Sequence, residues 1–291
     1  MKVHLVDGTY ELFRHFFGAP PHVNRSGQEV GATRGVLYSV LTMIEEGATH
    51  VGVATDHVIE SFRNGMWAGY KTGAGVDPLI LGQFDLLEDA LSAMGVTVWA
   101  MVDQEADDGM ASAASVAAAD PAVDQVVICT PDKDLGQCVT GTRVVQLDRR
   151  RNAVIDEDGV RAKFGVSPSS IPDYLALVGD TADGFPGLPG WGAKSSAAVL
   201  ARYGHLEDIP DAPGQWDVAI RNVGTLAATL RAQRDLAYLF RDLATLRTEP
   251  AVIDTVEELR WAGPADGFEA FCVEHFDAPA LAARAARLGG A

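Results

Sequence analysis

The chain has 291 residues, of which 47% are hydrophobic and 22% are charged. This composition is typical of a folded globular protein and excludes a disordered or fibrous one. The net charge of −17 argues against nucleic-acid binding by the surface as a whole, because phosphate binding draws on clustered Lys and Arg. A local basic strip remains compatible with this charge, and acids that bind metal ions would neutralise part of it.

The N-terminal sequence, MKVHLVDGTYELF, lacks the apolar region of a secretory signal. No run approaches the roughly 18 apolar residues that a membrane helix needs. We therefore expect a cytoplasmic protein with no membrane partner, and a monomer. The three cysteines, Cys129, Cys138 and Cys272, have no zinc-ligand spacing, so we expect buried thiols.

Short β-branched segments alternate with helical segments over the first half of the chain. The expected strands are VHLVD, HVGVATD, VTVWAMV, QVVICTPD and TRVVQLD. Apolar residues at helical spacing predict crossover helices at 33–47 and 78–94, and the alanine-rich segment 111–119 predicts a well-packed helix. This alternation is typical of an α/β fold with a parallel sheet.

The pattern changes near Asp156, after which mainly helices are expected. Gly and Pro interrupt them at 184–192 and around 210–214. The sequence therefore predicts an α/β core over 1–165 and a helical region over 166–291.

Acidic residues recur where expected strands end and helices begin. Seven acids lie in such positions: Asp7, Asp56, Glu105, Asp107, Asp108, Asp132 and Asp134. Asp180 and Asp183 form a further pair just before the Gly/Pro-rich turn, three residues apart and so on the same side of a helical turn, which makes nine acids in all. Ligands of open parallel sheets bind beyond the carboxyl ends of the strands, so these carboxylates should meet at one edge. Any single Asp there is also explained as a helix cap or turn residue. Together they predict sites for Mg²⁺ or Mn²⁺, because oxygen ligands suit hard cations and crowded carboxylates need compensation.

Two such cations about 4 Å apart can activate water and stabilise a leaving oxygen in phosphodiester hydrolysis. The motifs, in chain order, are Asp7-Gly8 with Arg14, Asp56 with Ser61-Phe62-Arg63, Tyr70-Lys71, Glu105-Ala106-Asp107-Asp108, Asp132-Lys133-Asp134-Leu135, and Gly179-Asp180 to Gly192. This series resembles the 5′ nuclease domain of bacterial DNA polymerase I, within the flap endonuclease and 5′-3′ exonuclease family. The resemblance implies a stand-alone nuclease with a PIN-like parallel-sheet core and a helical arch.

The resemblance also divides the nine acids between two metal sites. It implies that one ion is associated with Asp7, Asp56, Glu105, Asp107 and Asp108, and the other with Asp132, Asp134, Asp180 and Asp183. Some of these acids would act through water. Water is then the nucleophile in the cleavage of DNA near a 5′ end or at a flap, in replication or repair, and an RNA primer remains open as a substrate.

A glycine-rich turn at 184–204 resembles the helix-hairpin-helix turn of a helix-three-turn-helix element in this family. Gly190 and Gly192 would let the backbone approach duplex phosphates, and Lys194 would add a cation. The resemblance implies a monovalent cation, K⁺, at this turn. The alternative is an ordinary loop before a capped helix, and Trp191 is expected to pack in the core.

Residues 63–80 resemble the arch through which a 5′ single strand passes in the family. The resemblance implies that Arg63 and Lys71 contact the scissile phosphate and that Arg14 and Tyr70 contact DNA, although a packed Tyr70 is an equal alternative. The chain departs from the family's usual residues at three positions: Ala74 replaces a basic residue, Gly184 replaces an Asn and Ser195 replaces a Thr.

Three other functions fit the sequence less well. Val6-Asp7-Gly8-Thr9 resembles the signature of haloacid-dehalogenase phosphatases, but Leu5 stands where their nucleophilic Asp is needed. A nucleotide-cofactor enzyme is disfavoured because no strand is followed by GxGxxG or a P-loop. The remaining alternative is a DNA-structure-binding relative with weak or no catalysis, against which the presence of all nine acids argues.

Overall fold

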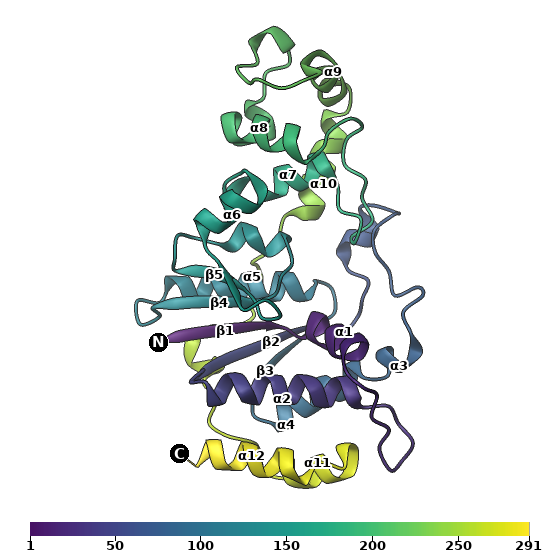
Figure 1. The fold of residues 1–291 in the computed structure, drawn as a ribbon, viewed down its shortest axis with the longest axis vertical. Helices are drawn as coiled ribbons and strands as arrows, with labels where there is room; N and C mark the ends of the chain where they lie inside the picture. The colour runs from purple at the N-terminus through teal and green to yellow at the C-terminus, as the bar shows by residue number, and fades with distance from the viewer. Residues whose placement is uncertain (291) are drawn as a thin grey trace. The chain divides into compact units, whose positions relative to one another are not determined.

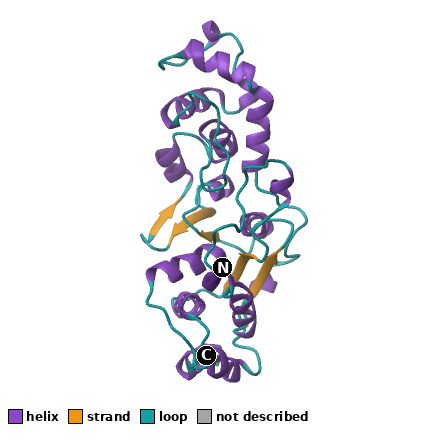
Figure 2. Ribbon diagram, turned by 90° about the vertical axis from the view of Figure 1, so that its right-hand side faces the viewer, coloured by secondary structure: helices purple, strands orange, loops and turns teal. Residues whose placement is uncertain are grey.

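The computed structural model describes residues 1–290 and contains two compact units (Figures 1 and 2). The first unit comprises Met1–Ile59, Gly73–Thr130 and the chain from Thr248 onward. The second comprises Glu60–Thr72 and Pro131–Arg247. Among the described residues, none of the helices combines the length and apolar character that crossing a membrane requires.

The first unit contains four parallel strands in the order β3-β2-β1-β4. These strands are β1 (Lys2–Asp7), β2 (His50–Asp56), β3 (Thr97–Met101) and β4 (Gln125–Cys129), which confirms four of the expected strands. In the register, Leu5 is paired with Gly52 on one side and Ile128 on the other. Strands that are buried on both faces have nearly continuous apolar sequences, and β4, with the sequence QVVIC, is an example.

Helices cover both faces of these strands. They are α1 (Gly8–Gly18), α2 (Gly31–Glu45), α3 (Pro78–Leu81), α4 (Phe84–Ala93), α5 (Ala106–Ala119), α11 (Phe268–Phe276) and α12 (Pro279–Gly289), with a 3₁₀ turn at Val256–Leu259. The α5 helix packs against all four strands on one side, and α2 and α4 lie on the other side (Figure 1). Outside these, α12 packs on α2 and α11 on α4.

The helix expected at 78–94 is broken into α3 and α4. The break falls at Gly82 and Gln83, whose side chain is fully buried. The Oε1 atom of Gln83 accepts hydrogen bonds from the backbone N–H and the hydroxyl of Thr33, at 3.0 and 3.1 Å. A buried amide must be hydrogen-bonded, so this contact with α2 fixes the position of the break.

The second unit contains the strands β5 (Val144–Asp148) and β6 (Ala153–Ile155), which pair antiparallel. The strand expected at TRVVQLD is therefore present, whereas its antiparallel neighbour β6 is not among the strands expected from the sequence. The connection between them is a short turn, which joins antiparallel strands, whereas a parallel pair needs a long crossover.

The helices of the second unit surround one apolar core. They are α6 (Glu157–Phe164), α7 (Ile171–Val178), α8 (Ala193–Tyr203), α9 (Val223–Ala232) and α10 (Arg234–Ala244), with 3₁₀ turns at Phe62–Gly65, Asp134–Cys138, Pro168–Ser170, Leu206–Asp208 and Pro213–Gln215. Phe185 stacks on Phe240 with ring centroids 5.5 Å apart, and Trp67 meets Phe240 edge-on at 5.1 Å. Trp67 therefore attaches residues 60–72 to this core.

The compact units differ from the expected division at residue 165. Residues 131–165 belong with the helical unit, whereas the chain from Thr248 belongs with the four-strand unit. Trp261 anchors this last segment, because its backbone N–H donates to Thr49 and its indole N–H to Met94, both at 2.9 Å. The expected arch at 63–80 is also divided after Thr72, and within it only Phe62–Gly65 and Pro78–Leu81 are helical.

All three cysteines are free thiols. Cys129 and Cys272 are buried as expected, and burial raises the pKa of Cys272 to about 12. Cys138 is only half-buried, so the expectation of a buried thiol is wrong at this position.

Candidate metal centre

Asp7 lies where the strand order of the first unit reverses direction. The chain runs from β1 outward through β2 to β3 and then returns to place β4 on the other side of β1. Such a switch point is where open α/β sheets bind ligands. Asp7 accepts a hydrogen bond from the hydroxyl of Thr130, which follows β4, at 3.0 Å, and one from the backbone N–H of Tyr10 at 2.8 Å. Asp7 is therefore also the N-cap of α1, which agrees with the alternative that a single Asp in this position is a helix cap.

Two further acids of the first unit, Asp56 and Asp108, are fixed around the start of α5. The Asp56 carboxylate accepts a hydrogen bond from the Ala106 N–H at 2.8 Å, which joins the end of β2 to the helix. Asp108 is fully buried and accepts from the backbone N–H of Glu105 at 3.0 Å. Carboxylates are favoured there by the positive end of the helix dipole. Asp107, in the same first turn, is partly exposed.

Three acids of the second unit converge. Asp134, Asp180 and Asp183 each offer a carboxylate oxygen within 4.8 Å of the others. Asp134 is only 5% exposed, and its Oδ1 atom has no hydrogen-bond partner within residues 1–290. Asp132 is exposed and accepts a hydrogen bond from the Asp134 N–H at 3.0 Å.

Burial and negative neighbours oppose ionisation of Asp134. Burial raises the pKa of Asp134 well above its ordinary value, and the charges of Asp132, Asp183 and Asp180 raise it further. An unpaired buried carboxylate oxygen in such surroundings is costly unless a cation or proton compensates it. The donor set consists of oxygen atoms and fits a hard divalent cation.

Two lysines of the second unit contact this group of acids. The Lys71 Nζ atom lies 3.2 Å from Oδ1 of Asp183, and the Lys133 Nζ atom lies 2.6 Å from Oδ2 of Asp180. Burial lowers the pKa of Lys133, but the hydrogen bond and charge of Asp180 outweigh this effect and raise it overall. Lys133 was part of an expected motif but had no expected role, although its position between Asp132 and Asp134 was the available signal.

Gly184 explains one departure from the family's usual residues. Its φ is +82°, and a Cβ atom there would lie 2.0 Å from the carbonyl oxygen of Gly69. The indole N–H of Trp67 also donates to the Gly184 carbonyl, at 3.1 Å. An Asn side chain is therefore excluded by the close approach of residues 67–69.

Arg63, Tyr70 and Arg14 are all engaged within the protein. Arg63 is 1% exposed and donates to the carbonyls of Leu243 and Thr245 at 2.8 and 3.1 Å, where α10 ends. To contact a phosphate, Arg63 would therefore have to break its hydrogen bonds to these two carbonyls, which have no other partner within the helix. Tyr70 is 4% exposed in the apolar core, which agrees with the packed alternative. Arg14 pairs with Glu11 at 2.5 Å within α1.

The turn before α8 borders a pocket of about 590 Å³. Gly190, Gly192 and Lys194 line one part of it, and Arg221 and Asn222, just before α9, line another. Ser195 accepts a hydrogen bond from the Gly192 N–H at 3.1 Å, so the departure at 195 supplies a local cap. Trp191 is buried against Trp216, as expected. Arg221 is not among the DNA-contacting residues expected from the sequence, because no motif contains it.

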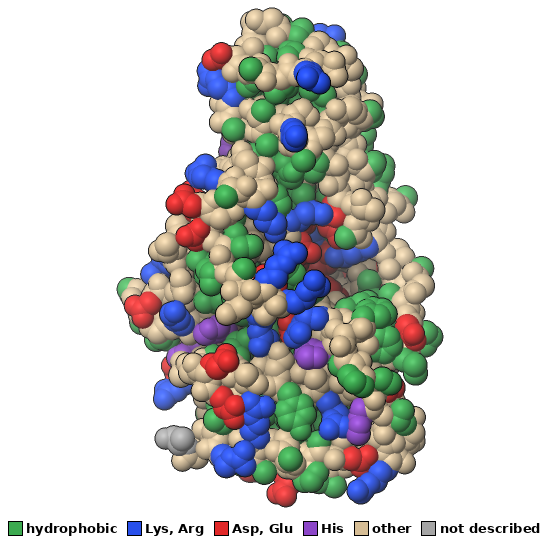
Figure 3. Space-filling view, in the orientation of Figure 1, with side chains coloured by type: hydrophobic (Ala, Val, Ile, Leu, Met, Phe, Trp, Pro, Cys, Tyr) green, Lys and Arg blue, Asp and Glu red, His purple; other side chains and the backbone are tan. Residues whose placement is uncertain are grey.

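Local charge at this pocket differs from the average of the chain. On the part of the helical unit that carries α8 and α9, the visible face shows mostly Lys and Arg rather than acids (Figure 3). Both Lys194 and Arg221 are exposed. The net charge of −17 therefore does not describe this surface.

Solved structures share this fold. The T5 D15 protein co-crystallised with metal ions matches with a TM-score of 0.67 at 16% identity, over 99% of this chain and 100% of that one. The catalytic core of Rad2 in complex with DNA substrate matches with a TM-score of 0.62 at 18% identity, over 95% of this chain and 88% of that one. At these identities the likeness concerns the fold alone.

Sequence relatives cover most of the chain. DNA polymerase I of Pseudomonas aeruginosa is 34% identical over 266 residues, which is 88% of this chain and 28% of that protein. DNA polymerase I of Mycobacterium leprae is 32% identical over 272 residues, with coverage of 88% and 29%. The chain thus spans less than a third of the length of these relatives.

Family descriptions match nearly the whole chain in two consecutive parts. The N-terminal resolvase-like domain of 5′-3′ exonucleases matches residues 2–165, and their C-terminal SAM fold matches residues 166–266. Together with the strand order and the placement of the acids, these matches show that the chain belongs to the 5′-3′ exonuclease family.

Proposed function

We propose that the protein is a structure-specific 5′ nuclease that hydrolyses DNA phosphodiester bonds at 5′ ends or 5′ flaps with two divalent cations, Mg²⁺ or Mn²⁺. The observation that carries the proposal is the convergence of Asp134, Asp180 and Asp183, with one buried Asp134 oxygen lacking a partner among the described residues. Family membership supports the same reaction.

The two groups of acids would each hold one cation. Asp132, Asp134, Asp180 and Asp183 would hold the first, and Asp7, Asp56, Glu105, Asp107 and Asp108 the second. When bound, such cations supply an activated water and stabilise the leaving oxygen of the displacement. The hydrogen bonds from Thr130 to Asp7 and from Ala106 to Asp56 support the proposal, because they orient these carboxylates in advance.

Lys71 is the cationic side chain that we assign to the transferring phosphate. Its ammonium group lies at Asp183, so it is available to a phosphate that reaches this group of acids. A fixed positive charge there stabilises the negative charge that builds up in the transition state. Arg63 remains a proposed partner of the same phosphate, although it is now hydrogen-bonded at the end of α10.

The turn before α8 would bind the duplex by its phosphates. Gly190 and Gly192 allow the backbone to come close, and Lys194 supplies a charge. We assign a K⁺ ion to this turn as a further ligand, and Arg14 to a DNA contact outside it. The T5 D15 flap endonuclease complex with DNA and metal ions and the Rad2 complex with DNA substrate support DNA as the partner.

The proposal is tested with 5′-labelled flap, nicked and blunt duplexes, each made with a DNA or an RNA 5′ strand. Cleavage should stop in EDTA and return with Mg²⁺ or Mn²⁺. Undiminished cleavage without metal would overturn the mechanism. Binding of flap DNA without cleavage under any metal would favour the alternative, a DNA-structure-binding relative that lacks catalysis.

A further inference from the structure

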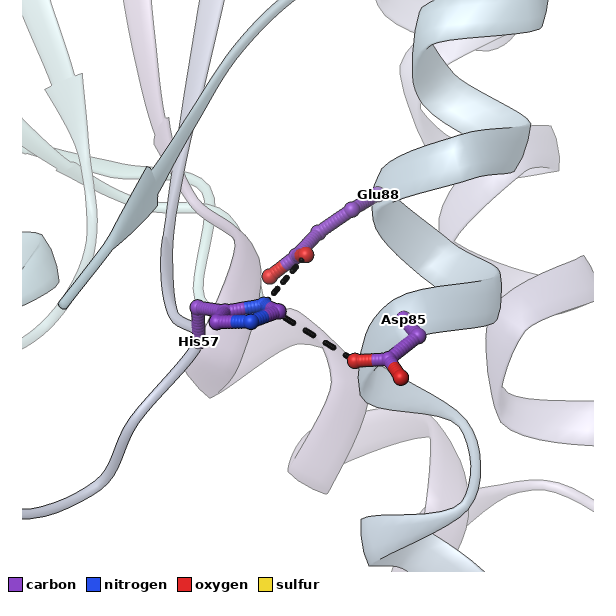
Figure 4. Close-up of side chains that lie close together, drawn as sticks. All are labelled: His57, Asp85 and Glu88. Carbon is purple, nitrogen blue, oxygen red and sulfur yellow. Dashed lines mark hydrogen bonds and ion pairs between the residues drawn. The ribbon is translucent and has the colours of Figure 1, made fainter.

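A histidine and two acids of the first unit meet apart from the nine acids discussed so far. His57 follows β2, and Asp85 and Glu88 project from α4 toward its ring (Figure 4). The Nδ1 atom of His57 lies 2.8 Å from Oε2 of Glu88 and 3.7 Å from Oδ1 of Asp85. One ligand atom from each residue lies within 4.8 Å of the other two.

Glu88 is held in place before any ligand arrives. Its side chain is 11% exposed, and its Oε1 atom accepts a hydrogen bond from the Thr55 hydroxyl at 2.7 Å. This contact orients the carboxylate so that Oε2 faces His57, as outer hydrogen bonds orient metal ligands. Asp85 lies three positions earlier on the same helix face. The Asp85 side chain is 85% exposed and that of His57 is 40% exposed, so the group is open to solvent.

We propose that His57, Asp85 and Glu88 form a third cation site, which takes a borderline transition metal such as Zn²⁺. In a tetrahedral site with bonds of about 2.1 Å, neighbouring ligand atoms are about 3.4 Å apart. The two separations from the His57 ring, 2.8 and 3.7 Å, bracket this value, and all three ligand atoms lie within 4.8 Å of one another. Three protein ligands leave the fourth position to water.

The ligand chemistry separates this site from the proposed catalytic sites. The nine acids offer oxygen atoms, which suit Mg²⁺, whereas His57 adds an imidazole nitrogen, which favours Zn²⁺. A bound ion would join the end of β2 to the start of α4. Since His57 directly follows Asp56, the ion would also restrain the segment that carries a proposed catalytic ligand.

The chain contains a matched control for this group. His205 is 46% exposed and its Nδ1 atom lies 2.8 Å from Oδ2 of the buried Asp173, which reproduces the His57–Glu88 pair. There, however, Arg241 lies 3.2 Å from the other Asp173 oxygen. Arg241 also lies 2.6 Å from Glu207, so a cation is already paired with both carboxylates at this place and should exclude a metal ion. His205 is therefore a control for a histidine–carboxylate contact that binds no metal.

The experiment is a Zn²⁺ titration of the whole chain in excess Mg²⁺, followed by calorimetry and by the side-chain nitrogen resonances of the histidines. We expect one Zn²⁺ equivalent that shifts the His57 ring nitrogens and raises the melting temperature. His57→Ala should abolish this binding, Asp85→Asn should weaken it about 10-fold or more, and His205→Ala should leave it intact. Asp85 is exposed, so its variant tests the site without disturbing the core.

Two results would overturn the proposal. One is a Zn²⁺ isotherm in His57→Ala that equals that of the unchanged protein. The other is a titration in which the His57 ring nitrogens do not shift while Zn²⁺ binds, because the ion would then occupy the oxygen sites. Neither readout depends on nuclease activity, so the outcome is separate from that of the proposed function.

Discussion

The Nζ atom of Lys71 lies 3.2 Å from Oδ1 of Asp183, and the Lys71 backbone N–H donates to the Asp183 carbonyl at 3.0 Å. Two residues that are far apart in the chain are thus joined twice, through the side chain and through the backbone. The segment that carries Lys71 is therefore attached to the loop that carries two of the proposed metal ligands, Asp180 and Asp183.

Lys71→Ala should reduce single-turnover cleavage at saturating enzyme by roughly 100-fold or more, because it removes a charge that stabilises the transition state. Duplex affinity should change little. Lys71→Arg, which retains the charge, should recover part of the rate. Cleavage by Lys71→Ala at the unchanged rate, measured on a 5′ flap, would show that this ammonium group does not act on the scissile phosphate.

Asp134→Asn should stabilise the metal-free protein while removing catalysis. The pKa of Asp134 is raised in the folded state, so at pH 7, above its ordinary value of 3.8, this carboxyl group destabilises the folded protein, and the cost disappears as the pH falls below 3.8. A gain of about 1 kcal/mol corresponds to roughly 2–4 °C in Tm for a protein of this size. Cleavage should fall by orders of magnitude, and stabilisation by Mg²⁺ should decrease.

Asp173→Asn is the control for this substitution. Asp173 is also buried but is paired with His205 and Arg241, so its neutralisation should lower the Tm at pH 7. Differential scanning calorimetry in EDTA at pH 7 and near pH 3 measures both variants. A lower Tm of Asp134→Asn at pH 7 would contradict the inferred cost of its charge.

Asp107→Asn should lower cleavage by orders of magnitude with little change in Tm, because it removes a proposed ligand charge from a partly exposed position. Asp103→Asn, four residues earlier and exposed, is the control and should cleave normally. The two variants are compared on one flap substrate in Mg²⁺. Equal turnover would remove Asp107 from the catalytic site.

Lys194→Ala and Arg221→Ala should each weaken duplex binding on all sequences and reduce the salt slope by about one unit. Both residues line the same pocket, and neither is assigned to the chemistry. Single-turnover cleavage at saturation should therefore stay nearly intact. Arg202→Ala, whose side chain pairs with Asp217, is the control. If the salt dependence of duplex affinity is unchanged in both pocket variants, the duplex does not bind at this pocket.

Gly184→Ala should destabilise the protein by at least about 1–2 kcal/mol, because it combines a positive φ with a clash against the Gly69 carbonyl. Gly224→Ala should instead increase the stability of the protein. Gly224 lies in α9, and among the described residues no atom outside its chain neighbours and its own helix backbone comes within 4 Å of its added Cβ, so helix propensity should stabilise by about 0.5–1 kcal/mol. Urea unfolding measures both, and equal midpoints would contradict the close approach.

The amino-acid sequence by itself determined the four parallel strands, the helices expected at 33–47 and 111–119, the change to a mainly helical chain after Asp156, and the candidate acids. These features are local. Runs of β-branched residues predict strands, and an acid that directly follows such a run, as after VVICT, must lie at the end of the strand because it is the next residue in the chain. The family was also recognisable, because its motifs are contiguous and occur in a fixed order.

Only the tertiary structure decided which groups these residues meet. Arg63 satisfies carbonyls at the end of α10, Tyr70 is buried in the helical core, and Arg221 shares a pocket with Lys194. These contacts depend on how segments far apart in the chain pack together, which periodicity and motif spacing do not encode. The same holds for His57 and Glu88, whose 2.8 Å contact arises because α4 packs beside the end of β2.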